Sequence, residues 1–222
     1  IDQIVEEKFI PLIEESYNEL AYYMDAYENK MVMGREVIAD AGIWTAKKRY
    51  ILNVLNSEGV QYAKPKLKIM GIEAVKSSTP ASCRDALKGL FNILIGGTED
   101  NTQKAIAIFN SHFVTLPPQD IAFPRGVSDI GKWKHPDTIY MKGTPIHVRG
   151  ALLYNALLKE LDLERKYTPI KDGEKIKFLY LNPKNPIKEN VIAFPDYLPE
   201  EFDLHKYVDH KLMFEKAFMN PV

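Results

Sequence analysis

The spacing of apolar residues along the chain predicts a protein that mixes helices and strands. Apolar side chains that recur every three to four residues indicate the buried face of a helix. This spacing predicts helices over residues 1–28, 80–96, 99–113, 145–161 and 204–218. Short runs rich in β-branched and aromatic residues predict strands over residues 43–56, 60–62, 175–181 and 191–194. The expected fold class is α+β, with a boundary near residue 72, where the β-like runs give way to helices.

Turn and capping residues indicate where these elements begin and end. Pro11 either kinks the first helix or begins its main part, because proline fits only the first turn of a helix. Gly59 closes a predicted hairpin turn over residues 56–59, since glycine accepts a positive φ. Thr79 is expected to cap the helix that follows it. Residues 117–145, interrupted by several prolines, are predicted to form a long loop.

Composition excludes several classes of protein. The 222 residues are 45% hydrophobic and 27% charged, which suits one large or two small globular domains. No apolar run approaches the roughly 18 residues of a membrane span. The single cysteine, Cys83, excludes an internal disulfide and a zinc site with several cysteines. The chain begins at Ile1, already in a helical pattern, so we expect a piece of a longer protein.

Charge is distributed unevenly along the chain. Residues 44–80 hold seven Lys and Arg against two acids, a local balance of +5. The rest of the chain carries 22 basic and 28 acidic residues, a balance of −6. Trp44, Tyr50 and Tyr62 are interleaved with the cations of the basic stretch. Basic residues with aromatic residues among them indicate a surface for a polyanion.

The sequence Lys47-Lys48-Arg49-Tyr50 lies inside the strand predicted over residues 43–56. Alternation along a strand places Lys48 and Tyr50 on one face and Lys47 and Arg49 on the other. One face would then pack or meet a polyanion while the other stays in water. The alternative is a solvated edge strand whose charges prevent aggregation.

Three motifs in order carry a resemblance to a known family. They are Lys47–Tyr50 (KKRY), Lys66–Gly71 (KLKIMG) and Lys76–Pro80 (KSSTP). In this order and at this separation they resemble the palm-to-thumb junction of B-family DNA polymerases, in particular the replicative polymerases of T-even-type bacteriophages. The resemblance covers nearly the whole chain, loosely between residues 84 and 140. Its further motifs are Gly34–Ala39, His147–Gly150 and Phe214–Phe218.

The resemblance implies two regions and a set of DNA contacts. Residues 1–72 would be the C-terminal part of the palm, and residues 73–222 a mainly helical thumb with a small β element. Lys48 and Tyr50 would meet the primer-terminal base pairs, and Lys76 the minor groove behind them. The other polar candidates suit phosphate contacts, and they are Lys47, Arg49, Ser128, Lys132, Lys142 and Arg149.

Catalytic chemistry is expected to lie outside this chain. Nucleotidyl transfer in this family uses two metal ions held by aspartates, and the Asp-Thr-Asp motif of the family is absent from the sequence. Glu36 matches a glutamate beside the metal site, but one carboxylate cannot hold two Mg²⁺. The chain alone is thus expected to bind no metal and to be inactive, with Mg²⁺ acting only in the complete polymerase.

The implied partners are a primer–template duplex and an N-terminal polymerase part that carries the exonuclease, the fingers and the catalytic aspartates. The implied location is the cytoplasm of an infected bacterial cell, without a membrane. A natural split subunit and an excised fragment both fit. Two other functions stay open: a stand-alone, non-catalytic duplex-binding or scaffold protein, and an α+β domain whose basic strand is only a solvated edge.

Overall fold

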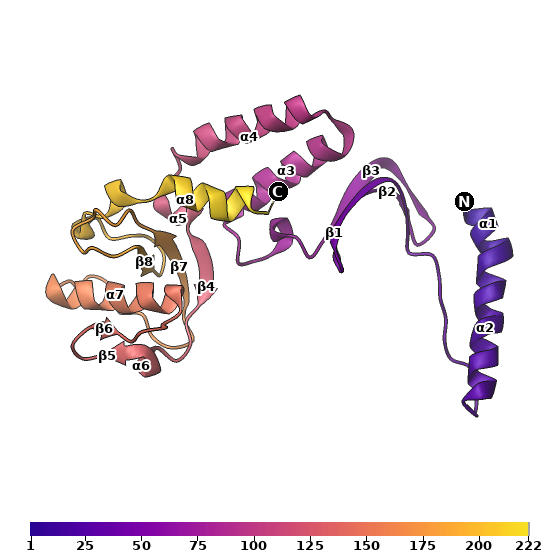
Figure 1. The fold of residues 1–222 in the computed structure, drawn as a ribbon, viewed down its shortest axis with the longest axis horizontal. Coiled ribbons are helices and arrows are strands. Elements are labelled where there is room, and N and C mark those ends of the chain that lie inside the picture. Colours follow the sequence, from indigo (N-terminus) through magenta and orange to yellow (C-terminus); the bar gives the residue numbers. More distant parts are fainter. Residues whose placement is uncertain (222) are drawn as a thin grey trace. The chain divides into compact units, whose positions relative to one another are not determined.

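The computed structural model describes residues 1–221, and its helices and small antiparallel sheets are shown in Figure 1. Helical residues make up 43% of the chain and strand residues 23%, which confirms the predicted α+β class. Internal contacts divide the chain into two compact units. The first unit holds residues 1–44 and 51–68, and the second holds residues 45–50 and the chain from Ile69 onward.

The first unit begins with a continuous helix. It consists of α1 (Asp2–Ile4), the π-helical turn η1 (Val5–Phe9) and α2 (Ile10–Tyr23). Pro11 lies at the start of α2, directly after the π-helical turn, and the helix continues through it. No residue of this helix is buried by the described part of the chain. The apolar face that predicted the helix is therefore uncovered here.

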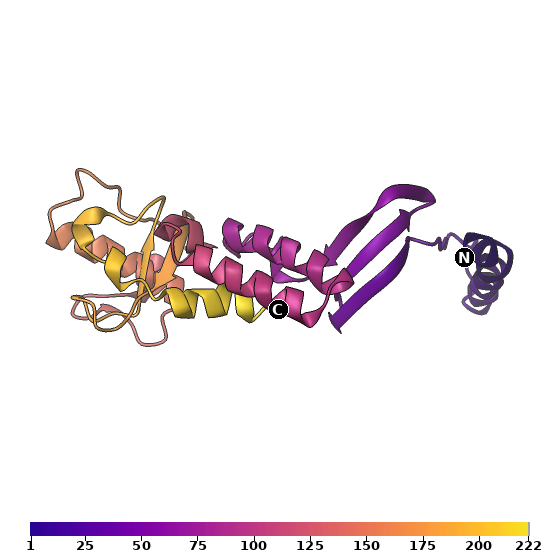
Figure 2. The same ribbon diagram turned by 90° about the horizontal axis from the view of Figure 1, so that it is seen from above.

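Three strands form a sheet of order β1-β2-β3, and Figure 2 shows them side by side. They are β1 (Val37–Ala46), β2 (Arg49–Ser57) and β3 (Val60–Met70). Glu58 and Gly59 join β2 to β3 with φ values of +49° and +85°. Two positive φ values in a two-residue loop suit the twist of a hairpin. The predicted turn over residues 56–59 is thereby confirmed.

The single strand predicted over residues 43–56 is wrong. Residues 47 and 48 form a turn between β1 and β2, and Lys48 has a φ of +62°. Strand backbone requires a negative φ, so the chain reverses here and the predicted alternation of side chains cannot extend across the turn. The residues from Thr45 to Tyr50 belong to the second unit.

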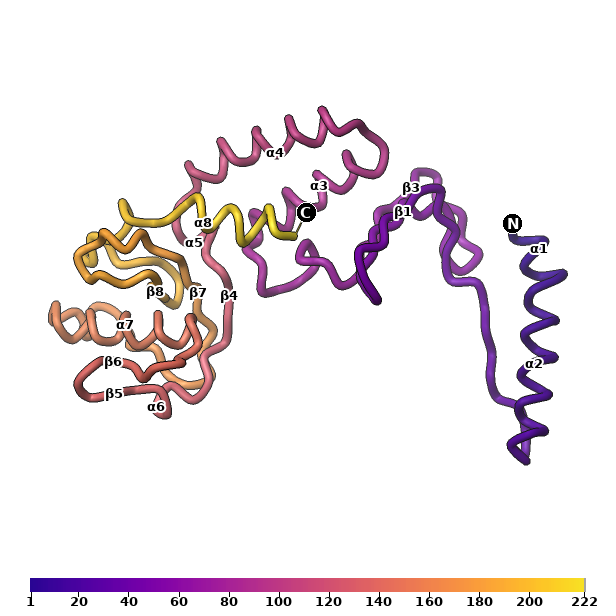
Figure 3. The backbone as a smooth tube through the Cα atoms, viewed as in Figure 1, coloured from indigo at the N-terminus to yellow at the C-terminus, as the bar shows by residue number. Residues whose placement is uncertain are grey.

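The second unit continues with the 3-10 turn η2 (Glu73–Val75) and two consecutive helices, α3 (Ala81–Gly96) and α4 (Glu99–Phe113), which Figure 3 traces. Thr79 does not cap α3, because Pro80 occupies the capping position and no side chain accepts a hydrogen bond there. Thr98 caps α4 by accepting a hydrogen bond from the backbone N–H of Asn101. The predicted bounds of α4 are confirmed.

The long loop predicted over residues 117–145 is also wrong. This segment contains short elements: α5 (Pro118–Ile121), β4 (Phe123–Gly126), α6 (Ile130–Trp133), β5 (Lys134–His135) and β6 (Ile139–Tyr140). β4 pairs antiparallel with β7 (Lys175–Tyr180), which pairs with β8 (Val191–Phe194) in a sheet of order β4-β7-β8. Pro124 is tolerated because β4 is an edge strand.

The core of the second unit lies between this sheet and α7 (Ile146–Glu160), which runs along β8 (Figure 1). All four residues of β8 are buried. Gly150 permits close contact, since a Cβ there would lie 2.9 Å from the backbone nitrogen of Ala193. The strands predicted over residues 175–181 and 191–194 are confirmed.

The last elements are the 3-10 turns η3 (Glu200–Phe202) and η4 (His205–Tyr207), α8 (His210–Phe214) and the π-helical turn η5 (Glu215–Met219). The helix predicted over residues 204–218 thus starts later, at His210, because the Asp209 side chain caps it. Aromatic rings join this segment to α4, and they belong to Phe109, Phe113, Phe214 and Phe218.

Candidate nucleic-acid interface

The KKRY turn, residues Lys47–Tyr50, presents two cations to solvent. Lys47 and Lys48 are exposed at the tip of the β1–β2 hairpin, whereas Arg49 and Tyr50, at the start of β2, are partly buried. A hairpin tip projects side chains in several directions, unlike the flat face of a strand. The predicted assignment of Lys48 and Tyr50 to one strand face, and of Lys47 and Arg49 to the other, is therefore wrong, because Lys47 and Lys48 lie in a turn.

Gly71 lies directly against this turn. Its φ is +69°, a conformation that L side chains rarely adopt, and a Cβ placed on it would lie 2.3 Å from the carbonyl oxygen of Lys48. The link from β3 to η2 thus passes in van der Waals contact with the backbone of the KKRY turn. Only glycine satisfies both the positive φ and the close approach.

Glu73 connects two of the predicted DNA-binding residues. Its Oε2 accepts a hydrogen bond from Nη2 of Arg49 at 2.8 Å, and its Oε1 accepts one from Nζ of Lys76 at 2.7 Å. Arg49 and Lys76, 27 positions apart, therefore share one carboxylate. We call these three side chains the Arg49–Glu73–Lys76 bridge.

The ionisation of Glu73 follows from this setting. Partial burial raises the pKa of the carboxyl, but the hydrogen bond from Lys76 and the charges of Lys76 and Arg49 outweigh that effect. The pKa of Glu73 consequently lies below its ordinary value, and the carboxylate stays charged at neutral pH. Sequence reasoning missed this residue. The available signal was its position as the only acid between Gly59 and Pro80.

Three of the other candidate residues lie on the surface of the second unit. Ser128 follows β4, Lys132 is in α6, and Lys142 is in the turn before α7, all of them exposed. The Lys132 ammonium lies 5.2 Å from the ring centroid of Trp133. These positions are accessible to a phosphate group, and that role stays a prediction.

Arg149 has protein partners of its own. The side chain is partly buried in α7, donates a hydrogen bond from Nη2 to Oδ1 of Asn190, and lies over the ring of Tyr140 at 5.5 Å. The Tyr140 hydroxyl in turn donates to Glu189 at 2.7 Å. A phosphate would have to compete with these contacts. The phosphate role of Arg149 stays a prediction.

Glu36 lies in the first unit, just before β1, and its carboxylate is paired with the Lys68 ammonium. Within residues 1–221 there is no group of three or more His, Cys, Asp or Glu residues that could hold a metal ion. Over the same residues, no helix is long and apolar enough to cross a membrane.

Comparison with known proteins finds similarity to a segment of two DNA polymerases. No protein-family model matches it, but two curated DNA-directed DNA polymerases of bacteriophages match it over its full length. Over its whole length the chain is similar to a segment of these T4-type phage DNA polymerases. This finding confirms the resemblance carried by the three motifs.

The two relatives are the polymerase of Enterobacteria phage T4, 34% identical over 234 residues, and that of Escherichia phage RB69, 34% identical over 239 residues. Each alignment covers 100% of this chain and 26% of the relative. The chain therefore spans about a quarter of the length of these curated polymerases.

Proposed function

We propose that this chain is the part of a phage DNA-directed DNA polymerase that holds the primer–template duplex. Residues 1–72 form the end of the palm and residues 73–222 the thumb. The carrying observation is that Arg49 and Lys76 meet at one carboxylate beside an exposed basic turn. Similarity to a segment of DNA polymerases supports DNA as the polyanion that this basic surface would bind.

Lys76 is suited to contact base pairs through the minor groove. Purine N3 and pyrimidine O2 accept hydrogen bonds there in every correct pair, whatever the sequence. A lysine that donates to such an acceptor therefore reads pair geometry and not base identity. A mispair moves the acceptor, and leaving a buried donor poorly paired costs about 1–3 kcal/mol. Lys48 and Tyr50 have the corresponding role at the primer-terminal pairs.

The remaining cations are assigned to phosphates. Lys47 is exposed in the KKRY turn, and Arg49 is exposed enough to reach a backbone oxygen while it stays bridged to Glu73. Phosphate contacts fix the register of the duplex and make binding sensitive to salt. The further phosphate candidates are Ser128, Lys132, Lys142 and Arg149.

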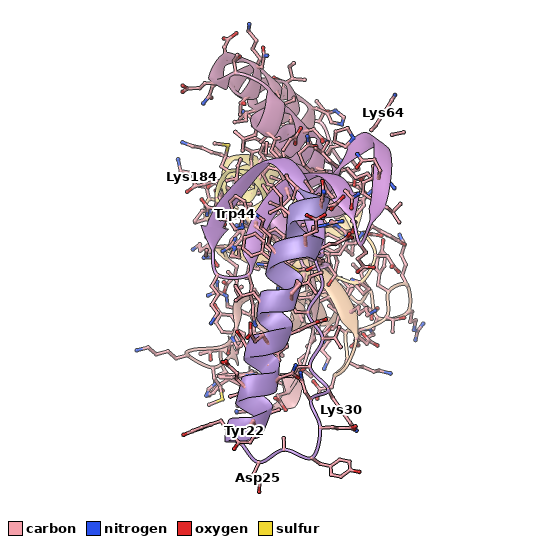
Figure 4. The ribbon with its side chains drawn as sticks, turned by 90° about the vertical axis from the view of Figure 1, so that its right-hand side faces the viewer. Tyr22, Asp25, Lys30, Trp44, Lys64 and Lys184 are labelled. Atoms are coloured by element: carbon pink, nitrogen blue, oxygen red, sulfur yellow. The ribbon has the colours of Figure 1, made fainter. Side chains whose placement is uncertain are left out.

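Catalysis would come from the rest of the polymerase. The Asp-Thr-Asp motif is absent from the sequence, so the Mg²⁺-binding aspartates belong to an N-terminal part. That part also carries the exonuclease and the fingers. Glu36 lies beside the site that the aspartates form. The uncovered helix of residues 2–23 suits contact with that part. Its Phe9 is 54% exposed and its Tyr22 90%, and Figure 4 shows Tyr22 projecting from the end of the helix. The complete enzyme replicates DNA inside the infected bacterial cell.

The test is duplex binding measured by fluorescence anisotropy. Primer–template, blunt duplex and single strand are titrated with the chain at several salt concentrations. We expect preference for primer–template and a negative salt slope. Lys48→Ala and Lys76→Ala should weaken binding, and the salt slope should become shallower because each removes a cation from the DNA interface.

Lys184→Ala is the matched control. Lys184 is an exposed lysine of the second unit, outside the candidate interface, and Figure 4 shows it at the surface. It removes the same charge and should leave binding near the wild-type value. Equal binding to blunt duplex and primer–template would instead indicate a stand-alone duplex-binding protein. Absence of binding by a folded chain in low salt would contradict the proposal.

A further inference from the structure

Glu73 is unfavourable for DNA binding if the surface needs only positive charge. A carboxylate beside two cations repels phosphate and cancels part of their attraction. Yet each oxygen of Glu73 takes a different cation, Oε2 binding Arg49 at 2.8 Å and Oε1 binding Lys76 at 2.7 Å. The rigid carboxylate plane therefore fixes the positions of the two cationic groups relative to each other.

The backbone around Glu73 is itself anchored. Its chain neighbours Ile72 and Ala74 are 2% and 0% exposed, so both are held in the core of the second unit. The N–H of Lys76 donates to the carbonyl of Glu73 at 3.1 Å, which closes the η2 turn. A lysine side chain has much rotamer freedom to lose when it is ordered. Here, a fixed turn orders the Lys76 side chain through Glu73.

Rigid contacts also link this turn to the KKRY turn. Gly71, two residues before Glu73, touches the carbonyl oxygen of Lys48, and Arg49 is the next residue along the hairpin. The bridge thus joins the segment that carries Lys76 to the segment that carries Lys48 and Tyr50. The candidate base-pair contacts from both segments are held in one geometry.

We propose that Glu73 is a positioning residue, which lowers the affinity for duplex DNA and in return sharpens the distinction between paired and mispaired primer ends. This inference rests on the proposed function. With Glu73 in place, Lys76 cannot follow a displaced acceptor, so a mispair loses the contact. Without Glu73, a mobile Lys76 reaches acceptors or phosphates in many arrangements.

A purely structural role for Glu73 has different consequences. If the carboxylate only stabilised the fold, its loss would lower the thermal midpoint and the affinity together, and the ratio of dissociation constants for mispaired and paired ends would not change. A positioning role predicts that affinity and discrimination change in opposite directions.

The main experiment uses Glu73→Gln in the full chain. The readout is the dissociation constant for two primer–template duplexes that differ only in whether the base pairs at and just behind the primer 3′ end are matched or mismatched. Removal of one negative charge adds about one effective cation, so the salt slope should steepen by about 0.9 and duplex binding tighten about eightfold in 0.1 M salt. The mismatch-to-match ratio should fall toward one.

Glu73→Asp separates charge from reach. Aspartate keeps the negative charge, but its side chain is one methylene shorter and cannot span both cations. We expect discrimination to fall as in Glu73→Gln, while the salt slope stays at the wild-type value. Asp203→Asn is the matched control, because Asp203 pairs with Lys206 three residues later at 2.6 Å, as Glu73 does with Lys76. It should change neither the slope nor the ratio.

The outcomes separate the inference from the proposed function. If the folded wild type does not bind duplex, or if Lys76→Ala changes nothing, the proposed function fails. If the wild type discriminates and Lys76→Ala abolishes this, but Glu73→Gln keeps the wild-type ratio or lowers affinity, only the inference is overturned. Failure of both Glu73 variants to fold would show a structural role and also overturn it.

Discussion

Replacement of Gly71 by alanine tests whether the KKRY turn is held by direct backbone contact. The substitution places a methyl group 2.3 Å from the carbonyl oxygen of Lys48, whereas real Cβ atoms essentially never come closer than 3.0 Å to a neighbouring atom. The turn or the β3–η2 link must therefore shift by at least 0.7 Å, the difference of these two distances. The change also forces a side chain to adopt a φ of +69°.

Both effects have a known size. A left-handed conformation costs an L-residue roughly 1–2 kcal/mol, and forcing an added methylene into tight packing costs about 1–3 kcal/mol. Gly71→Ala should therefore lower the free energy of unfolding by about 2–5 kcal/mol. That is a large part of the roughly 5–15 kcal/mol that stabilises a typical protein. Duplex binding should weaken as well, because the turn that carries Lys48 is displaced.

The assay is urea unfolding followed by far-UV circular dichroism, with Gly173→Ala as the matched control. Gly173 belongs to the same unit and has a φ of +82°, but no atom lies within 4 Å of its added Cβ. The control isolates the backbone strain, so it should lose only about 1–2 kcal/mol and bind duplex normally. Equal losses in the two variants would refute tight contact between Gly71 and Lys48.

Three further predictions concern the second unit. Burial raises the pKa of the Cys83 thiol to about 12, so at pH 8 only about one thiol in ten thousand is ionised. Ellman's reagent should therefore react readily with the chain unfolded in urea but very slowly with the native chain. A fast reaction of the native chain would contradict this prediction. Gly150→Ala should lower the melting temperature, because its Cβ would lie 2.9 Å from Ala193. Gly89→Ala should raise the melting temperature, because no atom lies within 4 Å of the added Cβ and alanine favours a helix over glycine by about 1 kcal/mol.

Sequence reasoning succeeded where local signals agreed. The helix over residues 99–113 was predicted to its observed bounds because a regular apolar stripe lies between the Gly96–Gly97 pair and Pro117. The hairpin at Glu58 and Gly59 was found for a similar reason, since glycine in a polar gap between two apolar runs is a strong turn signal. In both cases, neighbouring residues specify the structure.

The failures had the opposite cause. Pro124 hid β4, because proline argues against a strand unless the edge position is known, and that position depends on pairing with β7 more than 50 residues away. Lysine is not one of the usual turn residues, so the turn at Lys47 and Lys48 was predicted as part of a strand. The Arg49–Glu73–Lys76 bridge depends on the contact between Gly71 and Lys48, a tertiary contact that one sequence does not reveal.

The positive φ of Lys48 also has an evolutionary consequence. Glycine or asparagine would suit this backbone conformation better than lysine, by roughly 1 kcal/mol for glycine. A selection for thermal stability alone would therefore replace Lys48 and remove a cation from the hairpin tip. Under the proposed function, a selection that also requires replication would keep it. Paired selections on a library at this one codon would then measure how much folding stability is lost to keep a DNA-binding cation at the hairpin tip.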